Sequence, residues 1–467
     1  MMGGALGVKL AIARGVGVLS RLGGRGATSA PGKVLIGLDS HAIETLAGRL
    51  PRGSALISAT NGKTTTAAMA AAIFEQAGIT LVHNDAGANM AGGVASALLG
   101  AARARKGIAG ELGLFEVDEL WLDLLATQLH PRAILLANLF RDQLDRYGEL
   151  EAIGERWAQV RGRERLVLNA DDPLVADLGR ERSSALYYGV EDDSLALPGM
   201  AHAADAKHCR RCGAPYVFDA IYLGHLGRYH CPRCGQRRPA PAITATQIRL
   251  EGVRAVRFTL HTADGEGEVA LALPGLYNVY NALAAAALAN ALGVSLQHTL
   301  AGLQRAEAAF GRAESVTVSA GEASGEEGAP RRELRILLVK NPSGANEVLR
   351  TLVLEPGKHD LLGVLNDNIA DGRDVSWIWD ADFELLAGRI RRVTCSGTRA
   401  PELAMRLKYA GVEPEQIRVQ ADLRRALWQA VGDRNGSHAP LYALPTYTAM
   451  LSLRELLVKR GEAHAWS

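Results

Sequence analysis

The chain has 467 residues, enough for two or three domains with separate hydrophobic cores. Hydrophobic residues make up 48% and charged residues 22%, which is typical of a globular protein, and the formal net charge of +2 gives no indication of a nucleic-acid partner. No uncharged apolar run reaches the roughly 18 residues that a membrane-spanning helix needs, so an integral membrane protein is excluded at this stage.

The first 53 residues are expected to form a helical and strand segment that packs on the domain after it. Lys9, Arg14 and Arg21 interrupt the apolar residues there, so the segment has no continuous signal-peptide core and we expect a cytoplasmic protein. Residues 6–22 suit a short basic amphipathic helix. This helix would pack on the first domain or, in the alternative interpretation, contact an anionic membrane surface.

Residues 54–318 are predicted to form one α/β domain. Strand-like runs at residues 54–58, 113–117, 133–139 and 165–169 alternate with helical stretches. Further strand-like runs at 247–260 and 268–273 follow, and an Ala-rich helix is expected at 282–292. The alternation at the start of this segment predicts a parallel sheet with helices on both faces.

A phosphate-binding loop is predicted between the first strand and the next helix. It consists of Thr60, Asn61, Gly62, Lys63, Thr64 and Thr65. Backbone N–H groups at a helix N-terminus attract anions, and a glycine lets the backbone approach phosphates closely. Lys63 is suited to bridging the β- and γ-phosphates of ATP, and Thr64 to binding Mg²⁺. Ile57 stands where the common pattern has glycine, so the loop is a variant; its place between strand and helix argues against a chance match.

This loop resembles that of the Mur ligase superfamily, which joins amino acids or peptides to carboxylates through acyl phosphates. Further segments resemble the family at residues 115–119, 138, 142–148, 168–173 and 277–285. The resemblance implies that Glu116 binds Mg²⁺ and that Asn278 and Asn281 contact adenine. Alternatively, Glu116 is a surface carboxylate or a helix cap, and Asn281 caps the Ala-rich helix. Gln143 departs from the histidine usual in the family, which leaves a second metal or phosphate contact there open.

Four of the five cysteines form two Cys-x-x-Cys pairs. Cys209 and Cys212 are separated from Cys231 and Cys234 by 18 residues, the spacing of a Cys₄ zinc ribbon inserted at about residues 202–238. Four protein ligands leave the metal no open position, so the zinc is expected to be structural. Neighbouring arginines would suit nucleic acid, but an embedded ribbon favours a folding staple or a protein contact. Cys395 is expected to be a buried structural thiol.

A polar stretch at residues 319–332 is predicted to be a linker, and residues 333–467 a second, Rossmann-like α/β domain. Strands are expected there at residues 334–339, 361–365, 391–394, 417–419 and 441–444.

The ribbon and the C-terminal segments narrow the resemblance to one family. Ordinary Mur ligases lack a zinc ribbon, whereas the ribbon together with residues 340–346, 366–380, 396–400 and 447–450 resembles the MurT family, the synthetase subunits of lipid II isoglutaminyl synthase. In that family a glutaminase subunit, GatD, supplies a Cys-His pair, and an aspartate of the synthetase is thought to complete its triad. Asp374 is the first candidate for this aspartate, Asp371 the second and Asp380 the third; alternatively, they only cap helices or hold the loop.

The resemblance implies an ATP- and Mg²⁺-dependent ligase of peptidoglycan synthesis. It would amidate the α-carboxylate of D-glutamate in the lipid II stem peptide to D-isoglutamine, with ammonia that a GatD-like glutaminase releases from glutamine in a heterodimer. A lipid-linked substrate would place the enzyme at the inner face of the cell membrane. Two alternatives stay open: a Mur or folylpolyglutamate synthetase-like ligase that adds an amino acid, and a zinc-ribbon nucleic-acid-binding ATPase.

Overall fold

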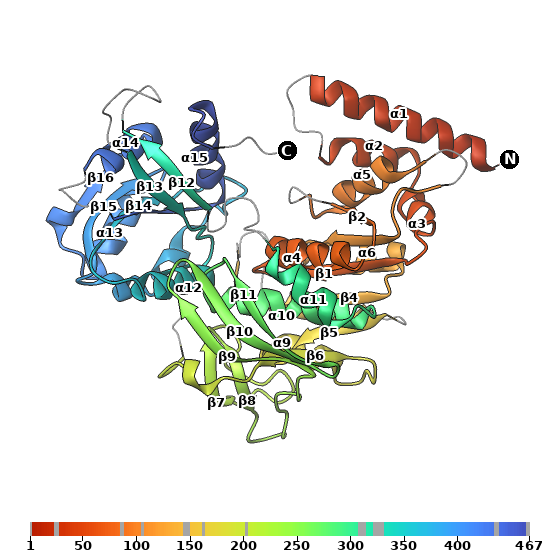
Figure 1. Ribbon diagram of the computed structural model, residues 1–467, viewed down its shortest axis with the longest axis horizontal. Coiled ribbons are helices and arrows are strands. Elements are labelled where there is room, and N and C mark those ends of the chain that lie inside the picture. The colour runs from red at the N-terminus through yellow and green to blue at the C-terminus, as the bar shows by residue number, and fades with distance from the viewer. Residues whose placement is uncertain are drawn as a thin grey trace.

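The computed structural model describes residues 2–22, 28–84, 88–103, 107–142, 150–160, 164–200, 204–306, 314–320, 331–433 and 439–463. These residues form an N-terminal group of helices, a large central α/β unit, a small two-stranded module and a C-terminal α/β unit (Figure 1).

The described part of the first 53 residues is helical and contains no strand, unlike the mixed segment that we expected. It comprises α1 (Met2–Leu22), α2 (Ala30–Leu38) and α3 (Ala42–Ala47). Helix α1 packs on α2, and Lys9 donates a hydrogen bond to Asp39 at 3.1 Å. Leu10 and Ala13 of α1 are buried, whereas Val8 and Ile12 are exposed. Among the helices that the structure describes, none combines the length and the apolar character needed to cross a membrane.

The central unit is built on a nine-stranded sheet in the order β11-β10-β9-β6-β5-β4-β1-β3-β2. Its strands are β1 (Ser54–Ser58), β2 (Leu81–His83), β3 (Leu112–Glu116), β4 (Ala133–Leu136), β5 (Arg165–Asn169), β6 (Leu186–Val190), β9 (Ile243–Glu251), β10 (Ala255–Thr262) and β11 (Gly265–Leu271). The strands pair in parallel from β2 to β9, and β10 and β11 are antiparallel.

The prediction of a single strand-like run at residues 247–260 was wrong. The run contains the end of β9 and most of β10, which pair antiparallel on either side of a turn at Gly252. Gly252 has a φ of +58°, a conformation that glycine adopts without strain. Apolar residues continue on both sides of this short turn, so hydrophobicity alone does not mark it.

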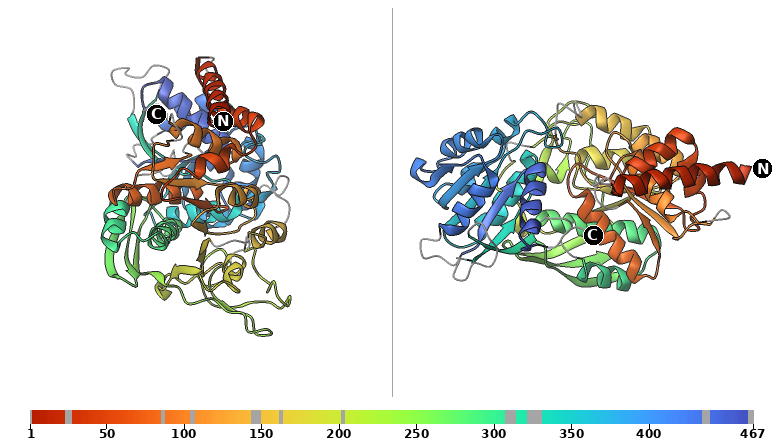
Figure 2. Two further views of the ribbon diagram at one scale, coloured as in Figure 1. Left: turned by 90° about the vertical axis from the view of Figure 1, so that its right-hand side faces the viewer. Right: turned by 90° about the horizontal axis from the view of Figure 1, so that it is seen from above.

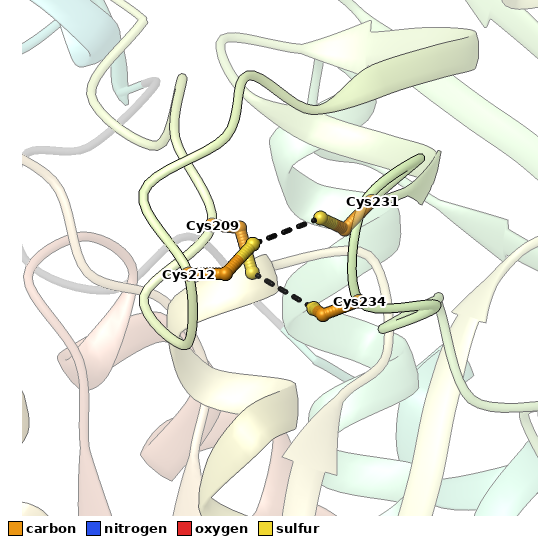
Figure 3. Close-up of side chains that lie close together, drawn as sticks. All are labelled: Cys209, Cys212, Cys231 and Cys234. Atoms are coloured by element: carbon orange, nitrogen blue, oxygen red, sulfur yellow. Dashed lines mark hydrogen bonds between the residues drawn. The ribbon is translucent and has the colours of Figure 1, made fainter.

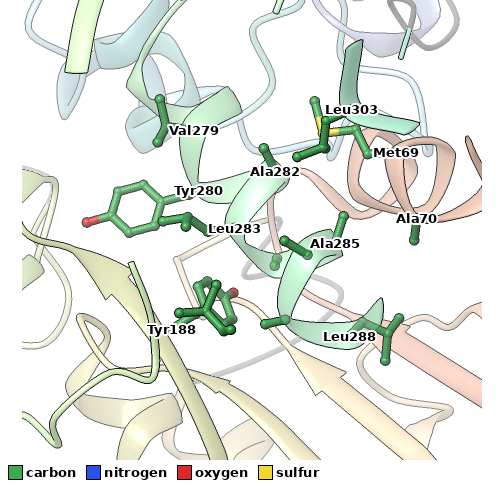
Figure 4. Close-up of a cluster of buried hydrophobic side chains, with 14 of the residues drawn as sticks. Met69, Ala70, Tyr188, Val279, Tyr280, Ala282, Leu283, Ala285, Leu288 and Leu303 are labelled. Carbon is green, nitrogen blue, oxygen red and sulfur yellow. The ribbon is translucent and has the colours of Figure 1, made fainter. Parts of the chain in front are cut away.

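Helices cover both faces of the central sheet. They are α4 (Lys63–Gln76), α5 (Ala91–Ala101), α6 (Leu122–Leu129), α8 (Leu150–Ala158), α9 (Pro173–Ala176), α10 (Leu276–Ala291) and α11 (Leu296–Gln304). Strand β1 shows why: Ile57 packs in the cluster around α4 and α10, and Leu56 packs in the cluster on the opposite face. Figure 4 shows the first cluster, in which Leu283 of α10 lies near Tyr188 of β6. The predicted fold class is confirmed.

The small module is a hairpin of β7 (Val217–Leu223) and β8 (Leu226–His230), with the four paired cysteines around its base. It leaves the central unit after β6 and returns to it at β9, and it lies beside β9 in Figure 1. An insertion at this place was expected from the cysteine spacing.

The C-terminal unit has a six-stranded sheet in the order β12-β13-β17-β14-β15-β16, which Figure 2 shows beside the central unit. Its strands are β12 (Glu314–Ser319), β13 (Arg331–Ile336), β14 (His359–Val364), β15 (Ile390–Ser396), β16 (Ile417–Val419) and β17 (Leu441–Pro445), and its helices are α12 (Pro342–Val353), α13 (Ala400–Tyr409), α14 (Leu423–Gly432) and α15 (Tyr447–Lys459). Only β12 runs antiparallel to its neighbour.

The expected linker at residues 319–332 does not separate the two sheets. Residues 314–319 already form β12, the edge strand of the C-terminal sheet, and pair with β13. Residues 321–330 lie outside the described part of the chain. The expected boundary left residues 314–318 of β12 in the central domain, although Val316 and Val318 are buried in the C-terminal core and the polar Thr317 between them is exposed.

Candidate functional site

The predicted phosphate loop connects β1 to α4 and is held by the end of the neighbouring strand β4. The Asn61 N–H donates to Asn138 Oδ1 at 2.9 Å, and Asn138 Nδ2 donates back to the Asn61 carbonyl at 3.0 Å. The Phe140 N–H donates to Thr60 Oγ1 at 3.1 Å. Gly62 has a φ of +83° and is the N-cap of α4. The loop conformation therefore depends on residues 138–140 as well as on its own sequence.

Lys63 lies among buried carboxylates at the carboxyl end of β3. Its Nζ donates to Glu119 Oε2 at 2.8 Å and also to the carbonyl of Ala59. Burial alone would lower the pKa of Lys63, but the charge of Glu119, with smaller contributions from two nearby carboxylates, raises it overall. The ammonium therefore stays charged. Glu119 was not among the candidate site residues, although it lies three positions after Glu116 in a segment that resembles the Mur ligases.

Thr64 and Glu116 form a possible Mg²⁺ site beside the loop. The Thr64 hydroxyl lies 3.2 Å from Glu116 Oε1, so two oxygen ligands meet at the edge of the sheet. Glu116 is only 4% exposed and ends β3, which excludes the alternatives of a surface carboxylate and a helix cap. This donor set fits a hard divalent cation.

Asn278 and Asn281 lie on α10, next to the phosphate loop. Helix α10 begins at Leu276, so Asn281 is inside the helix and the alternative that it caps the helix was wrong. Asn281 Nδ2 donates to Asn278 Oδ1 at 3.0 Å, and the Thr66 hydroxyl lies 3.3 Å from Asn281 Oδ1. A Cβ added to Gly62 would lie 2.1 Å from Asn281 Oδ1, so this approach requires glycine.

Two residues of the C-terminal unit contact the phosphate loop. Lys340 Nζ donates to the Thr60 carbonyl at 3.0 Å and to Asp142 Oδ2 at 2.5 Å. Asn341 Nδ2 donates to Asn61 Oδ1 at 2.9 Å. Both residues lie in a stretch that resembles the MurT family, but no local signal identified them as loop contacts. The possible contact at Gln143 lies outside the described residues.

A pocket opens where three parts of the chain meet. The central unit contributes residues that include Asn61, Asn278 and Asn281; the hairpin contributes Leu223 and Leu226; and the C-terminal unit contributes residues that include Lys340 and Glu347. Amide groups and apolar side chains thus surround one cavity next to the phosphate loop, a combination typical of small-molecule sites.

The three candidate aspartates, Asp371, Asp374 and Asp380, line a second pocket at the boundary between the two units, together with Arg141 and Lys340. Their surroundings differ. Asp371 is buried and accepts a hydrogen bond from the Thr448 N–H of α15 at 2.7 Å, so it holds the loop to that helix. Burial raises the pKa of Asp371, although Thr448 partly offsets this effect.

Asp374 is exposed at the rim of this second pocket. It accepts the Ser376 N–H at 2.8 Å, and hydrogen bonds from Ser376 lower its pKa. Asp380 lies 3.5 Å from a guanidinium nitrogen of Arg141. Asp367, which was not a candidate, accepts hydrogen bonds from the Thr398 hydroxyl at 2.7 Å and Arg399 Nε at 2.8 Å.

The four paired cysteines converge at the base of the hairpin (Figure 3). Their sulfurs lie within 4.8 Å of one another; Cys209 is 3.5 Å from Cys234, and Cys212 is 3.4 Å from Cys231. Zn–S bonds of about 2.3 Å place tetrahedral sulfurs about 3.8 Å apart, so the cluster fits Zn²⁺. Hydrogen bonds from the backbone of Cys234 and Arg233 lower the pKa of Cys231 to about 6, whereas burial and hydrogen bonds with the neighbouring thiols raise the pKa of Cys234 to about 11.

Cys395 is separate from this cluster. It is fully buried in β15, and burial raises the pKa of its thiol to about 12. The thiol is therefore unreactive, as expected for a structural cysteine.

Comparison with solved structures defines the class of protein. A pseudomurein peptide ligase type C from Methanothermus fervidus superposes with a TM-score of 0.67 at 22% identity, covering 89% of this chain and 80% of that one. MurF from Acinetobacter baumannii superposes with a TM-score of 0.62 at 17% identity, covering 92% and 80%. Residues 57–213 match the Mur ligase middle domain model. The chain therefore has the Mur ligase fold.

The C-terminal unit and the full-length relatives identify the family. Residues 338–450 match the model of the MurT ligase C-terminal domain. The chain is 33% identical to the lipid II isoglutaminyl synthase (glutamine-hydrolyzing) subunit MurT of Streptococcus pneumoniae, over 95% of this chain and 94% of the relative. It is 32% identical to the MurT subunit of Staphylococcus aureus, over 95% of each. The chain belongs to the MurT family.

The cysteine cluster makes a prediction about metal content. Cys212→Ser should reduce bound zinc from about one ion per chain toward zero and destabilise the protein by roughly 3 kcal/mol or more, because a structural metal contributes folding energy. Cys395→Ser is the control, since Cys395 lies outside the cluster. Elemental analysis and thermal unfolding measure both effects. Full zinc occupancy in Cys212→Ser would exclude a four-thiolate site.

The close approach of Gly62 to Asn281 makes a second prediction. Gly62→Ala should destabilise the protein by about 3 kcal/mol, because the new Cβ meets Asn281 in addition to the strain of a positive φ. Gly78→Ala is a matched control: Gly78 follows the same helix with a φ of +72° and open space around it, so its cost should be about 1 kcal/mol. Denaturant unfolding compares them. Equal costs would contradict the observed contact.

Proposed function

We propose that this chain is the ATP-dependent amidating subunit of a lipid II isoglutaminyl synthase. The observation that supports it most is the phosphate loop, with Lys63, Thr64 and Glu116 at one sheet edge, in a chain that matches MurT subunits over 95% of its length. The proposed substrate is the α-carboxylate of D-glutamate in the lipid II stem peptide.

The proposed reaction has two balanced steps. A carboxylate oxygen attacks the γ-phosphorus of ATP, the bond to the β-phosphate oxygen breaks, and ADP leaves. Ammonia then attacks the carbonyl carbon of the acyl phosphate, loses a proton, and expels inorganic phosphate to give D-isoglutamine. Each step is a displacement on an activated centre, and positioning and charge stabilisation account for most of the catalysis.

The residues at the loop are suited to the first step. Loop N–H groups at the start of α4 and the charged Lys63 attract the phosphates, and Asn278 and Asn281 offer amides for the adenine edge. Thr64 and Glu116 would hold Mg²⁺, which screens the phosphate charge when bound. Lys340 brings a second cation from the C-terminal unit to the loop carbonyl of Thr60. Each unit thus places a lysine at the loop, and each of these lysines is paired with a carboxylate of the central unit.

The ammonia is proposed to come from a GatD-like glutaminase subunit, in a heterodimer. Of the three candidate aspartates, Asp374 suits the triad role best, because it is exposed at the rim of the second pocket, where a side chain of a partner protein can reach it. Asp371 already accepts a hydrogen bond from Thr448, and Asp380 lies beside Arg141. An exposed apolar group, with Trp379 and Tyr409 at 5.9 Å between ring centroids, lies near this loop and suits a protein interface.

A lipid-linked substrate would bring the protein to the inner face of the membrane. Exposed Val8, Ile12, Val18 and Leu19 of α1 support such contact, since α1 has no acidic residue.

The first test separates amidation from amino-acid ligation. With ATP and lipid II, ammonium or glutamine plus the glutaminase should support the reaction, and mass analysis should show a loss of about 1 Da, because OH (~17) becomes NH₂ (~16). Glu116→Gln should lower the rate about 100-fold or more with either nitrogen source. Glu75→Gln, an exposed position on α4, is the control and should retain the rate. Ligation of free amino acids without amidation would overturn the proposal.

The second test assigns the triad aspartate. Asp374→Asn should reduce glutamine-dependent amidation about 100-fold or more, because the glutaminase histidine loses its ionised partner, while ammonium-dependent amidation stays within about twofold. Measuring both rates on the same preparation separates this effect from misfolding.

Asp371→Asn, Asp380→Asn and Asp367→Asn serve as comparisons within the same loop. We expect the first to lower both rates together, because Asp371 holds the loop to α15. If Asp367→Asn or Asp380→Asn alone loses only the glutamine-dependent reaction, the role belongs to that residue and the assignment of Asp374 is wrong.

A further inference from the structure

The hairpin β7–β8 extends from the four-cysteine site to the pocket beside the phosphate loop. Cys231 follows β8 directly at the base of the hairpin. At the other end, residues 223–226 form the hairpin tip, where Leu223 pairs with Leu226 across a two-residue turn. Leu223 and Leu226 line the same pocket as Asn61, Asn278 and Asn281. One rigid element thus joins the metal site to the candidate nucleotide site.

The hairpin tip is fixed against residues that hold the phosphate loop. Gly224 has a φ of +59°, and a Cβ on it would lie 2.9 Å from the Phe140 ring. The His225 ring is fully buried, with its centroid 4.6 Å from that of Phe140. Phe140 in turn donates its N–H to Thr60 of the loop. A displacement of the tip would therefore disturb the packing of the phosphate loop.

Two adjacent buried aspartates connect the hairpin to the core of the site. Asp172 Oδ2 lies 3.5 Å from His225 Nε2 and accepts the Leu139 N–H at 2.9 Å. Asp171 accepts hydrogen bonds from Arg238 Nε at 2.5 Å, just after the second cysteine pair, and from the Tyr280 hydroxyl at 2.7 Å. Tyr280 belongs to α10, which carries Asn278 and Asn281. These contacts link both ends of the module to the candidate site.

We propose that the hairpin tip is part of the nucleotide site, with Leu223 and Leu226 forming an apolar surface for the base and ribose of ATP. The proposal rests on the proposed use of ATP. Purine bases have apolar faces and polar edges, and the pocket offers apolar leucines together with the amides of Asn278 and Asn281. The cysteine site then has a second role: it holds the base of the hairpin whose tip the nucleotide contacts.

Hydrogen exchange on the unmodified protein tests this inference without a variant. Saturating the protein with a non-hydrolysable ATP analogue in the presence of Mg²⁺ should slow amide exchange in residues 217–230 as well as in residues 59–66. Ligand binding reduces local opening of the segments that form the site. Protection of residues 59–66 with unchanged exchange at 217–230 would overturn the inference and leave ATP binding intact. Protection of neither segment would count against the proposed function as well.

A matched pair of variants tests the leucine directly. Leu226→Ala should weaken binding of a fluorescent ATP analogue about tenfold, because the base loses apolar contact, whereas Leu226→Met keeps the volume and should stay within about threefold. Val217→Ala lies at the exposed far end of the same hairpin and should stay within about twofold. Zinc content and thermal unfolding are measured on each variant.

The outcomes separate affinity from folding. Leu226→Ala with bound zinc, a cooperative unfolding transition and unchanged nucleotide affinity would overturn the inference. If Leu226→Ala fails to fold, the exchange measurement on the unmodified protein decides, because unchanged exchange at residues 217–230 contradicts the inference. Failure of the unmodified protein to bind any nucleotide would instead reject ATP use.

Discussion

The buried ion pair between Lys63 and Glu119 is the interaction on which the site depends most. Its side chains are 12% and 4% exposed and lie 2.8 Å apart. Glu116 and Asp118 are also buried at the same edge, so the chain brings several carboxylates close together in a region with little water. Such a group is stable only when cations compensate it, and removing one partner of a buried pair commonly costs about 3–5 kcal/mol. Lys63 therefore has a structural role as well as its proposed role toward phosphates.

Lysine–carboxylate pairing also occurs across the boundary between the two units. Lys340 of the C-terminal unit pairs with Asp142, which follows β4, and reaches the Thr60 carbonyl of the phosphate loop. The neighbouring Asn341 caps α12 through its side chain and pairs with Asn61. One short segment thus begins a helix of the C-terminal unit and contacts the loop of the central unit. Since Lys340 and Asn341 also line the pocket of the candidate aspartates, the two proposed reaction centres share one connecting segment.

The parts of the site that could be predicted from the sequence are those whose residues lie close together along the chain. The phosphate loop lies within a few consecutive residues, and the cysteine pairs have a spacing that metal geometry requires. The limits of β1 and β5 were predicted to the residue because apolar runs mark buried parallel strands; the limits of β16, an edge strand with two exposed residues, matched as well. The MurT resemblance added the aspartate loop, which composition alone describes only as polar. Local patterns thus locate the candidate chemistry, but not how its parts meet.

The contacts between distant segments were not predictable in this way. Lys340 and Thr60 are separated by 280 residues, and nothing near Lys340 indicates its partner. Glu119 was missed because its importance comes from burial beside Lys63, which a sequence does not display. The boundary at β12 was missed because β12 joins the C-terminal sheet by pairing with β13, which lies on the far side of the polar stretch in the sequence.

The small size of the four-cysteine module explains why it depends on the rest of the chain. Its hydrophobic cluster consists of Cys209, Cys231, Tyr216 and Tyr229 with a few partly buried neighbours, too little to stabilise a segment of this length alone. The four cysteines are suited to hold the base of the hairpin through a bound metal, Arg238 pairs with Asp171 just after the second cysteine pair, and His225 at the tip lies 3.5 Å from Asp172. Because the hairpin is anchored at both its base and its tip, a displacement of the base moves the tip more directly than it would in a module on a flexible linker. The anchoring contacts lie on the segments that position the phosphate loop, so the module's position follows that of the loop.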